Sequence, residues 1–214
     1  MFSIEKIKNL LPDYLRTADK DRLSKALAQF QTDRGNIDYT DFYIWDTPDF
    51  WLQGDLLFSI RQPQDYSHLT KAYGKDYGPA IIISNTCDLE ASNKRFTEKE
   101  CLMAVVYTVE DWVERMGNLN PSAAKLHIEN LKKQLLSNFL YLPPLPEDSG
   151  YKQGYVVRLD SIFKFPVSEL NSENYIKARN EIRVATLSNF GFYLFIIKLS
   201  YHFCRLPEDP HRPE

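Results

Sequence analysis

The apolar residues of this chain follow two different periods, and each period predicts its own kind of element. Apolar side chains recur at helical spacing in four ranges, each interpreted as an amphipathic helix: 3–11, 23–30, 109–116 and 121–135. Alternating or continuous apolar runs predict strands at 52–60, 80–83, 101–107, 139–142 and 155–159. The pattern therefore predicts an α+β fold whose core is mainly β-sheet. Just after the last predicted strand, Asp160, Ser161 and Ile162 are expected to turn the chain out of the sheet.

The final apolar segment differs from the others because it is hydrophobic on nearly every side. From Ala185 to Arg205 the spacing is helical, and so apolar a helix cannot leave one whole face in water. It either passes through the core or forms a subunit interface. Interface contacts on this helix are expected at Phe190, Leu194, Ile197 and Phe203.

Changes in pattern along the chain suggest one main domain with additions. Residues 1–49 are interpreted as an N-terminal helical extension, because helical spacing and an aromatic segment precede the first strand. Residues 50–205 form the main β-domain, with inserted helices around 109–138. Residues 206–214 are rich in proline and charge, so we expect a flexible tail there.

The stretch GPAIIISNTCDL, residues 78–89, is the most informative one in the chain. Ala80 to Ile83 are too few for a typical helix and rich in β-branched residues, which predicts a central strand buried on both faces. A polar turn follows, and turns held at the end of a rigid strand often carry binding groups. We expect a binding or loop-ordering role for its residues, which are Asn85, Thr86, Cys87 and Asp88.

The cysteines leave two chemical alternatives open. Cys87 could be a nucleophile, with Asp88 and a distant histidine such as His68 or His202 tuning it, although a lone cysteine at a strand end is more often a small packed residue. Asp88 could be a base or a metal ligand, although a turn-forming carboxylate is the commoner role. The cysteines and His202 match no established zinc spacing, so no metal or other cofactor is predicted.

Composition narrows the setting in which the protein works. The 214 residues carry a net charge of −3, so there is no global attraction to nucleic acid or to an anionic membrane. Three cysteines without a C-x-x-C pair suit a reducing compartment, and we expect a cytoplasmic protein. The most apolar stretch, residues 190–199, is about half of the roughly 20 residues needed to cross a bilayer, so no membrane partner is predicted.

Several short strings resemble the PemK/MazF family of small β-barrels, which are similar to Src-homology-3 domains. QGDLLFS at 53–59 resembles the opening strand of that family, and GPAIIISN at 78–85 is similar to its Arg-Pro strand. LMAVVYT at 102–108 resembles its third strand. GYVVRLDSIFKF at 154–165 is similar to a later strand and its Asp-x-Ile turn, and RVATLS at 183–188 resembles the start of its terminal helix. The resemblance implies a small β-barrel.

The same resemblance bears on activity. Many members of that family are endoribonuclease toxins with an arginine before the proline of the second strand and a threonine closing the third. Thr108 matches the threonine, but Gly78 stands where the arginine is expected, and glycine cannot stabilise charge developing on phosphorus. A relocated cation would have to come from one of the flanking segments, which contain Arg61, Lys71, Lys75 and Arg95.

Two functions from different classes remain open. In the first, the protein is an accessory subunit of a prokaryotic antiphage-defence or toxin–antitoxin-like system and docks a protein partner or a second copy of itself. In the second, it is a toxin-like endoribonuclease that uses Thr108 with a relocated basic residue such as Arg61, and RNA or DNA would then be its partner. Aromatic residues such as Trp45 and Trp51 could stack on bases in that case, although nearly all aromatics of this kind in a folded protein are core or interface anchors.

Overall fold

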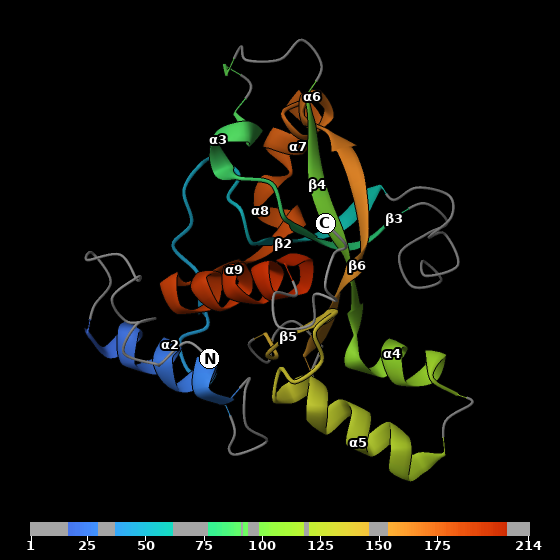
Figure 1. The fold of residues 1–214 in the computed structure, drawn as a ribbon. Coiled ribbons are helices and arrows are strands. Elements are labelled where there is room, and N and C mark those ends of the chain that lie inside the picture. The colour runs from blue at the N-terminus through green and yellow to red at the C-terminus, as the bar shows by residue number, and fades with distance from the viewer. Residues whose placement is uncertain are drawn as a thin grey trace, which may run out of the picture.

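One antiparallel sheet organises the molecule (Figure 1). A computed structural model describes residues 17–29, 37–61, 77–90, 92–93, 99–117, 120–145 and 154–204. The seven strands within these ranges lie in the spatial order β1 (Tyr43–Ile44), β7 (Arg183–Leu187), β2 (Asp55–Arg61), β3 (Tyr77–Ile82), β4 (Glu100–Thr108), β6 (Tyr155–Pro166) and β5 (Phe139–Leu142). The predicted α+β class with a core made mainly of sheet is confirmed.

Helices cover both faces of this sheet. In chain order they are α2 (Thr17–Gln29), α3 (Thr86–Leu89), α4 (Val109–Arg115), α5 (Pro121–Lys132), α6 (Val167–Leu170), α7 (Glu173–Lys177), α8 (Arg179–Ile182) and α9 (Asn189–Cys204). α9 and α2 lie side by side on one face, and α6 to α8 cover the other. α4 and α5 pack against β5 and β6 at the far end of the sheet.

β3 lies in the middle of the strand order and is buried on both faces, as its sequence predicted. Ile81 packs into the core beneath α9, while Ala80 and Ile82 point into the core beneath α6. All three are fully buried. This alternation follows from the period of two along a strand, so an uninterrupted apolar run is what a strand between two helical layers requires.

The two ends of the sheet come close to each other without pairing. Within the described residues, β1 and β5 share no backbone ladder, so the sheet is open and has two edges. Side chains nevertheless link the edges, because the Tyr43 hydroxyl donates a hydrogen bond to the carbonyl of Pro143 at 2.9 Å. The ring of Tyr39 also lies 5.4 Å from that of Tyr141 in β5. The sheet is therefore strongly curled.

Two predictions about the later part of the chain are wrong. Asp160 to Ile162 do not leave the sheet, because alternate residues of β6 remain buried up to Pro166. A register shift absorbs the polar residues instead: β6 advances from Val157 to Ile162 while β4 moves only from Val106 to Ala104. Residues 185–187 are strand, not helix, because β2 and β1 pair with β7 on its two sides.

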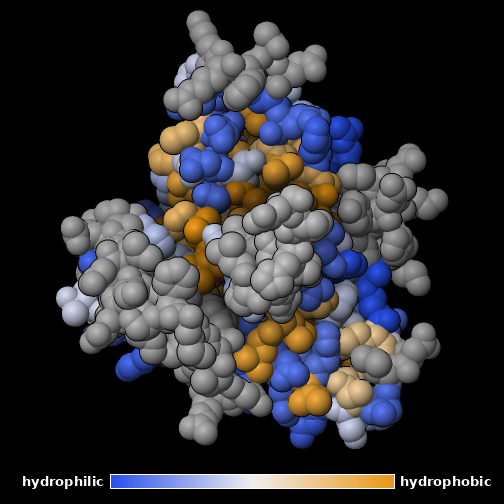
Figure 2. Space-filling view, in the orientation of Figure 1, coloured by the Kyte–Doolittle hydropathy of each residue, from blue (hydrophilic) through white to orange (hydrophobic). Residues whose placement is uncertain are grey.

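α9 itself is only partly covered. Figure 2 shows hydrophobic residues gathered across the middle of the molecule, where Figure 1 places this helix. Phe190, Leu194 and Phe195 are buried in the core, and Ile196 and Ile197 are half-buried. Within the described ranges no helix combines the length and hydrophobicity needed to span a membrane.

Two of the predicted helices are found in the structure, and two other predicted segments lie outside the described residues. The predicted helices at 109–116 and 121–135 correspond to α4 and α5, and Asn120 caps α5 by accepting from the Ala123 amide at 2.8 Å. The segment assigned to the N-terminal extension supplies an edge strand, β1. The predicted helix at 3–11 and the predicted tail at 206–214 lie outside the described residues.

Candidate binding surface around Trp45

A tight corner at Gln53, Gly54 and Asp55 leads the chain into β2. Gly54 has a φ of +88°, and a Cβ added there would lie 2.9 Å from Leu187 Cδ1, so this corner favours glycine. Asp55 is fully buried and its carboxylate accepts hydrogen bonds from the Leu52 amide at 2.9 Å and the Thr186 hydroxyl at 2.6 Å. Gly54 and Asp55 belong to QGDLLFS, the string that resembles the family's opening strand, and the structure gives them a local role in closing the corner.

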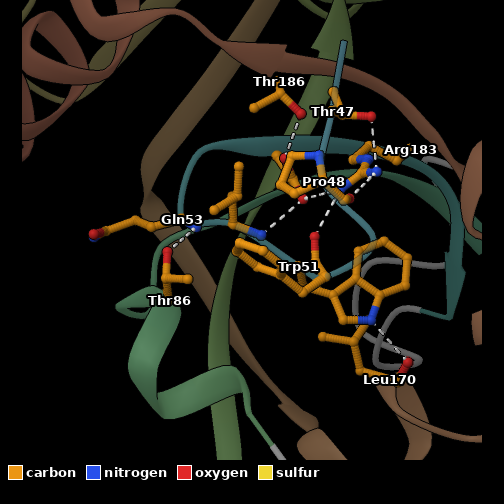
Figure 3. A network of polar contacts seen from close by, with 11 residues as sticks. Thr47, Pro48, Trp51, Gln53, Thr86, Leu170, Arg183 and Thr186 are labelled. Carbon is orange, nitrogen blue, oxygen red and sulfur yellow. Dashed lines mark hydrogen bonds and ion pairs between the residues drawn. The ribbon is translucent and has the colours of Figure 1, made fainter. Parts of the chain in front are cut away.

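The side chain of Arg183 neutralises Asp55 and also binds the segment 47–50, which precedes the corner in sequence (Figure 3). Its guanidinium lies 3.5 Å from an Asp55 oxygen. It also donates to main-chain or hydroxyl oxygens at 2.8 Å each, those of Thr47, Pro48 and Phe50. Burial raises the pKa of Asp55, and the hydrogen bonds from Thr186 and Leu52 and the charge of Arg183 oppose that rise.

Trp51 seals this buried pair from solvent. Its indole nitrogen donates to the Leu170 carbonyl at 3.1 Å, which ties the corner to α6. The guanidinium carbons of Arg179 and Arg183 lie 5.2 and 5.9 Å from its ring centre. Figure 3 shows the indole beneath the Arg183 contacts. Trp51 is thus an anchor in the core, with 2% of its surface exposed, and has no free face for a base.

The predicted polar turn forms α3 and docks onto the same corner. Asn85 caps it by accepting from the Cys87 amide at 3.0 Å, and Thr86 Oγ1 accepts from the Gln53 amide at 3.0 Å. Cys87 and Asp88 are exposed. No group of metal-ligating side chains occurs among the residues that the structure describes. Asn85 and Thr86 therefore order this turn.

The residues proposed for catalysis are engaged elsewhere. Thr108 is only 4% exposed, and its hydroxyl accepts from the Asp111 amide at 3.0 Å as the cap of α4. Arg61 stands at the corresponding end of β2 and forms an ion pair with Glu169 of α6 at 2.6 Å. Because β2 and β4 run in the same direction, the two residues lie at one end of the sheet with β3 between their strands.

The residues expected at an interface fall into two groups. Phe190 and Leu194 are buried in the core of the chain itself. Ile197 is half-buried, and Phe203 is 60% exposed near the end of α9. An interface on α9 stays a prediction. Of the four residues expected there, Ile197 and Phe203 are the two whose side chains are accessible to a partner.

Two hollows flank Trp45, and both share the segment Ile44 to Asp46. The larger is about 860 Å³ and extends toward α9, with a lining that includes Asp41, Tyr43, Gln53, Thr86, Phe190 and Phe192. The smaller is about 310 Å³ and lies along the edge of β7, with a lining that includes Asp49, Asn180, Arg183, Val184 and Ala185. Thr86 from the predicted turn and Phe190 from the predicted interface thus meet in the larger hollow.

This surface is both apolar and acidic. Trp45 and Phe50 are 56% and 54% exposed, and Ile44 is also exposed. Among the described residues, Asp46 and Asp49 make neither an ion pair nor a side-chain hydrogen bond. We call the exposed side chains of Ile44, Trp45, Asp46, Asp49 and Phe50, with the two hollows, the Trp45 surface.

Sequence reasoning did not single out the aspartates of this surface. The string DFYIWDTPD at 41–49 places Asp41, Asp46 and Asp49 around aromatic residues, and that mixture is the signal that was present. Comparison with models of known protein families gave no match to this chain, and comparison with curated proteins gave none.

Proposed function

We propose that this protein is an accessory, protein-binding subunit of a prokaryotic antiphage-defence or toxin–antitoxin-like system. It is built on a PemK/MazF-like barrel that lacks the usual arginine of that family, with Gly78 in its place. The Trp45 surface is the site through which it binds a protein partner. The presence of an exposed indole between two hollows is the observation that carries the proposal.

The strand arrangement supports the barrel part of this proposal. Four of the five strings that resemble the family fall on β2, β3, β4 and β6, which are consecutive neighbours in the sheet. The fifth, RVATLS, forms β7 instead of the start of a helix and does not contribute to this support. The curl of the sheet also brings its edges together through Tyr43 and Pro143. We interpret the fold as a barrel of this type in which side-chain contacts stand where a closing ladder would form.

The engagement of Thr108 and Arg61 supports a non-catalytic role over a ribonuclease. A ribonuclease of this type needs an accessible hydroxyl and a cation directed at the scissile phosphate. Thr108 is buried as a helix cap, and Arg61 faces a carboxylate. A substrate would have to displace both contacts before either group reached it.

Exposed aromatic side chains favour protein binding. Tryptophan contributes large contact area at low entropic cost and is enriched among the residues that dominate binding energy. Trp45 leaves more than half of its surface in solvent and shares its segment with Ile44 and Phe50. Ile44 and Trp45 line a hollow on each side of their segment.

The test is affinity capture of the tagged chain from its native host, with quantitative mass spectrometry. Trp45→Ala is compared with the wild type and with Leu126→Ala, a matched control because Leu126 on α5 is 57% exposed. We expect a stoichiometric partner, encoded beside the gene for this chain, with the wild type and the control but not with Trp45→Ala. Recovery of the same proteins by all three would contradict the proposal.

A second assay tests whether the protein is a ribonuclease. A panel of short RNAs is incubated with the wild type and with Thr108→Val, which keeps the shape of the side chain and removes the hydroxyl. We expect no cleavage above background by either protein. Cleavage by the wild type that the variant loses while remaining folded would replace the proposed function with the catalytic one.

A further inference from the structure

We infer that the Trp45 surface binds an extended, lysine- or arginine-bearing segment of a partner protein, which lies across Trp45 and alongside the edge of β7. This inference rests on the proposed function and names the chemistry of the partner. Its basis is the combination of unpaired carboxylates, exposed aromatic rings and an open strand edge at one place in the fold.

The accessible charge of the surface is negative. Asp46 lines both hollows, Asp41 lines the larger and Asp49 the smaller. In the described part of the chain two cations line these hollows, and both are already engaged: Arg183 is buried against Asp55, and Arg22 donates to the carbonyls of Asp38 and Thr40. A partner group in either hollow therefore meets carboxylates that pair with no cation among the described residues, which favours ammonium or guanidinium groups.

The aromatic lining suits the same chemistry. The rings of Tyr43 and Trp45 lie 6.0 Å apart, and Phe190 and Phe192 complete the wall of the larger hollow. Phe190 already carries a cation on its face, since the Arg22 guanidinium lies 4.2 Å from its ring centre. Aromatic faces beside carboxylates attract a cationic side chain and cover its aliphatic stem.

The free part of the β7 edge is the reason to expect that the partner's segment binds in an extended conformation. β1 pairs with β7 only through Tyr43 and Ile44, which stand opposite Leu187 and Thr186. Beyond this point the chain leaves the ladder at Trp45, and no described residue pairs with β7 on that side. The smaller hollow lies there and is lined by the remainder of the strand, residues 183–185. A short added strand would continue the sheet where β1 stops, with its side chains alternating toward Trp45 and Asp49.

RNA is the competing occupant, because exposed aromatic rings also stack on bases. The carboxylates decide between the two. A nucleic acid would place its phosphates among Asp41, Asp46 and Asp49, which repel them, whereas a basic peptide neutralises these groups. The surface therefore favours a basic segment.

The test measures peptide binding to the full chain by titration calorimetry. The probe is a peptide of about ten residues that alternates lysine or arginine with valine. Matched peptides carry glutamine or glutamate at the basic positions, another has N-methylated alternate amides, and an oligouridine stands for RNA. We expect binding of the basic peptide alone, weakened by added salt and by N-methylation. Hydrogen exchange should slow at residues 183–185 when the peptide is bound.

Variants locate the binding site. Trp45→Ala is expected to weaken binding about tenfold or more. Asp46→Asn and Asp49→Asn are each expected to weaken it about twofold to fivefold, since exposed charge pairs contribute modestly. Leu126→Ala should leave it unchanged. The inference is overturned if the glutamine peptide or the oligouridine binds as tightly as the basic peptide, or if the asparagine variants bind it as well as the wild type.

The capture experiment separates this inference from the proposed function. If the host partner is lost with Trp45→Ala but the basic peptide does not bind, the surface is a docking site and its assigned chemistry is wrong. If the basic peptide binds in the predicted way but no partner depends on Trp45, the chemistry stands and the proposed function fails.

Discussion

Two sets of charged residues lie close together in this fold and behave in opposite ways. Asp55 and Arg183 are buried beneath Trp51, and their polar atoms are satisfied by hydrogen bonds from several segments. Asp46 and Asp49, only a few residues earlier, are exposed and bonded to no described side chain. Arg183 borders both regions, since it pairs with Asp55 and also lines the smaller hollow.

The difference separates charges that hold the fold from charges that are available for binding. Burying a charge is costly unless hydrogen bonds and a counter-charge replace its water, so a fully satisfied pair has a structural role. An exposed carboxylate without a partner has little effect on the stability of the monomer. Its position beside Trp45 is therefore more simply explained by interaction with another molecule.

The largest expected effect comes from breaking the buried pair. Asp55→Ala leaves the Arg183 guanidinium buried without its carboxylate, and Arg183→Leu leaves the Asp55 carboxylate without its cation. Each is expected to lower the free energy of unfolding by about 3–5 kcal/mol, measured by urea denaturation. The double variant Asp55→Ala/Arg183→Leu should cost less than the sum of the two single changes. Single losses below about 1 kcal/mol would mean that the pair is not structural.

The elements around this pair differ in how well the sequence predicted them. Strands such as 80–83 and 139–142 were predictable because their apolar runs are decided locally, and the cap at Asn120 with Pro121 marked its helix for the same reason. β7 was missed because RVATL has no decisive period, and its conformation depends on pairing with β2, far away in sequence. The helices α6 to α8 were missed because each is only about one turn long.

The candidate site was less predictable than the fold. Asn85 and Thr86 were identified from their position after a strand, but their docking on Gln53 is a tertiary contact that no local pattern encodes. Thr108 was identified through a resemblance, and its use as a helix cap depends on α4 following it directly. The Trp45 surface depends on the pairing of β1 with β7, two segments that are far apart in sequence.

Lys198 is a second buried basic residue, and it differs from Arg183 in its protonation. Lys198 in α9 is buried and donates to the Gln134 carbonyl at 2.5 Å. Burial lowers the pKa of Lys198 to about 7 from its usual 10.5. In contrast to Arg183, it therefore exists largely as the neutral amine above neutral pH.

The consequence is a pH dependence of stability with a defined sign. Above pH 7 the unfolded chain holds a proton on Lys198 that the folded chain releases, so stability should rise with pH by up to about 1.4 kcal/mol per unit. The window from pH 7 to 9 is informative because cysteine ordinarily titrates near 9.0. Lys198→Met should remove this slope in urea denaturation series. An identical slope in wild type and variant would mean that Lys198 is protonated in the folded chain.

A smaller effect is expected at the corner that positions the buried carboxylate. Gly54→Ala places a Cβ at a positive φ and close to Leu187, so it should lower the free energy of unfolding by about 1–2 kcal/mol. Gly117→Ala is a control of the same chemistry at a glycine without positive φ, where the added Cβ meets the Glu114 carbonyl at 3.0 Å. Thermal denaturation of the two variants measures the loss of stability that each substitution causes. Equal losses would show that the corner at Gly54 carries no special strain.

The smallest expected effect on stability belongs to the Trp45 surface itself. Asp46→Asn should change the free energy of unfolding by less than about 0.5 kcal/mol, because its carboxylate is exposed. Trp45→Ala should lower it by about 1 kcal/mol at most, because its ring packs on Tyr43 but more than half of the residue is exposed. Urea denaturation checks this on the samples used for the binding measurements. If either variant lost as much stability as Asp55→Ala, the exposed residues would also be needed for the fold, and the contrast with the buried pair would disappear. Near-neutral stability together with lost peptide binding is the combination that only a binding surface produces.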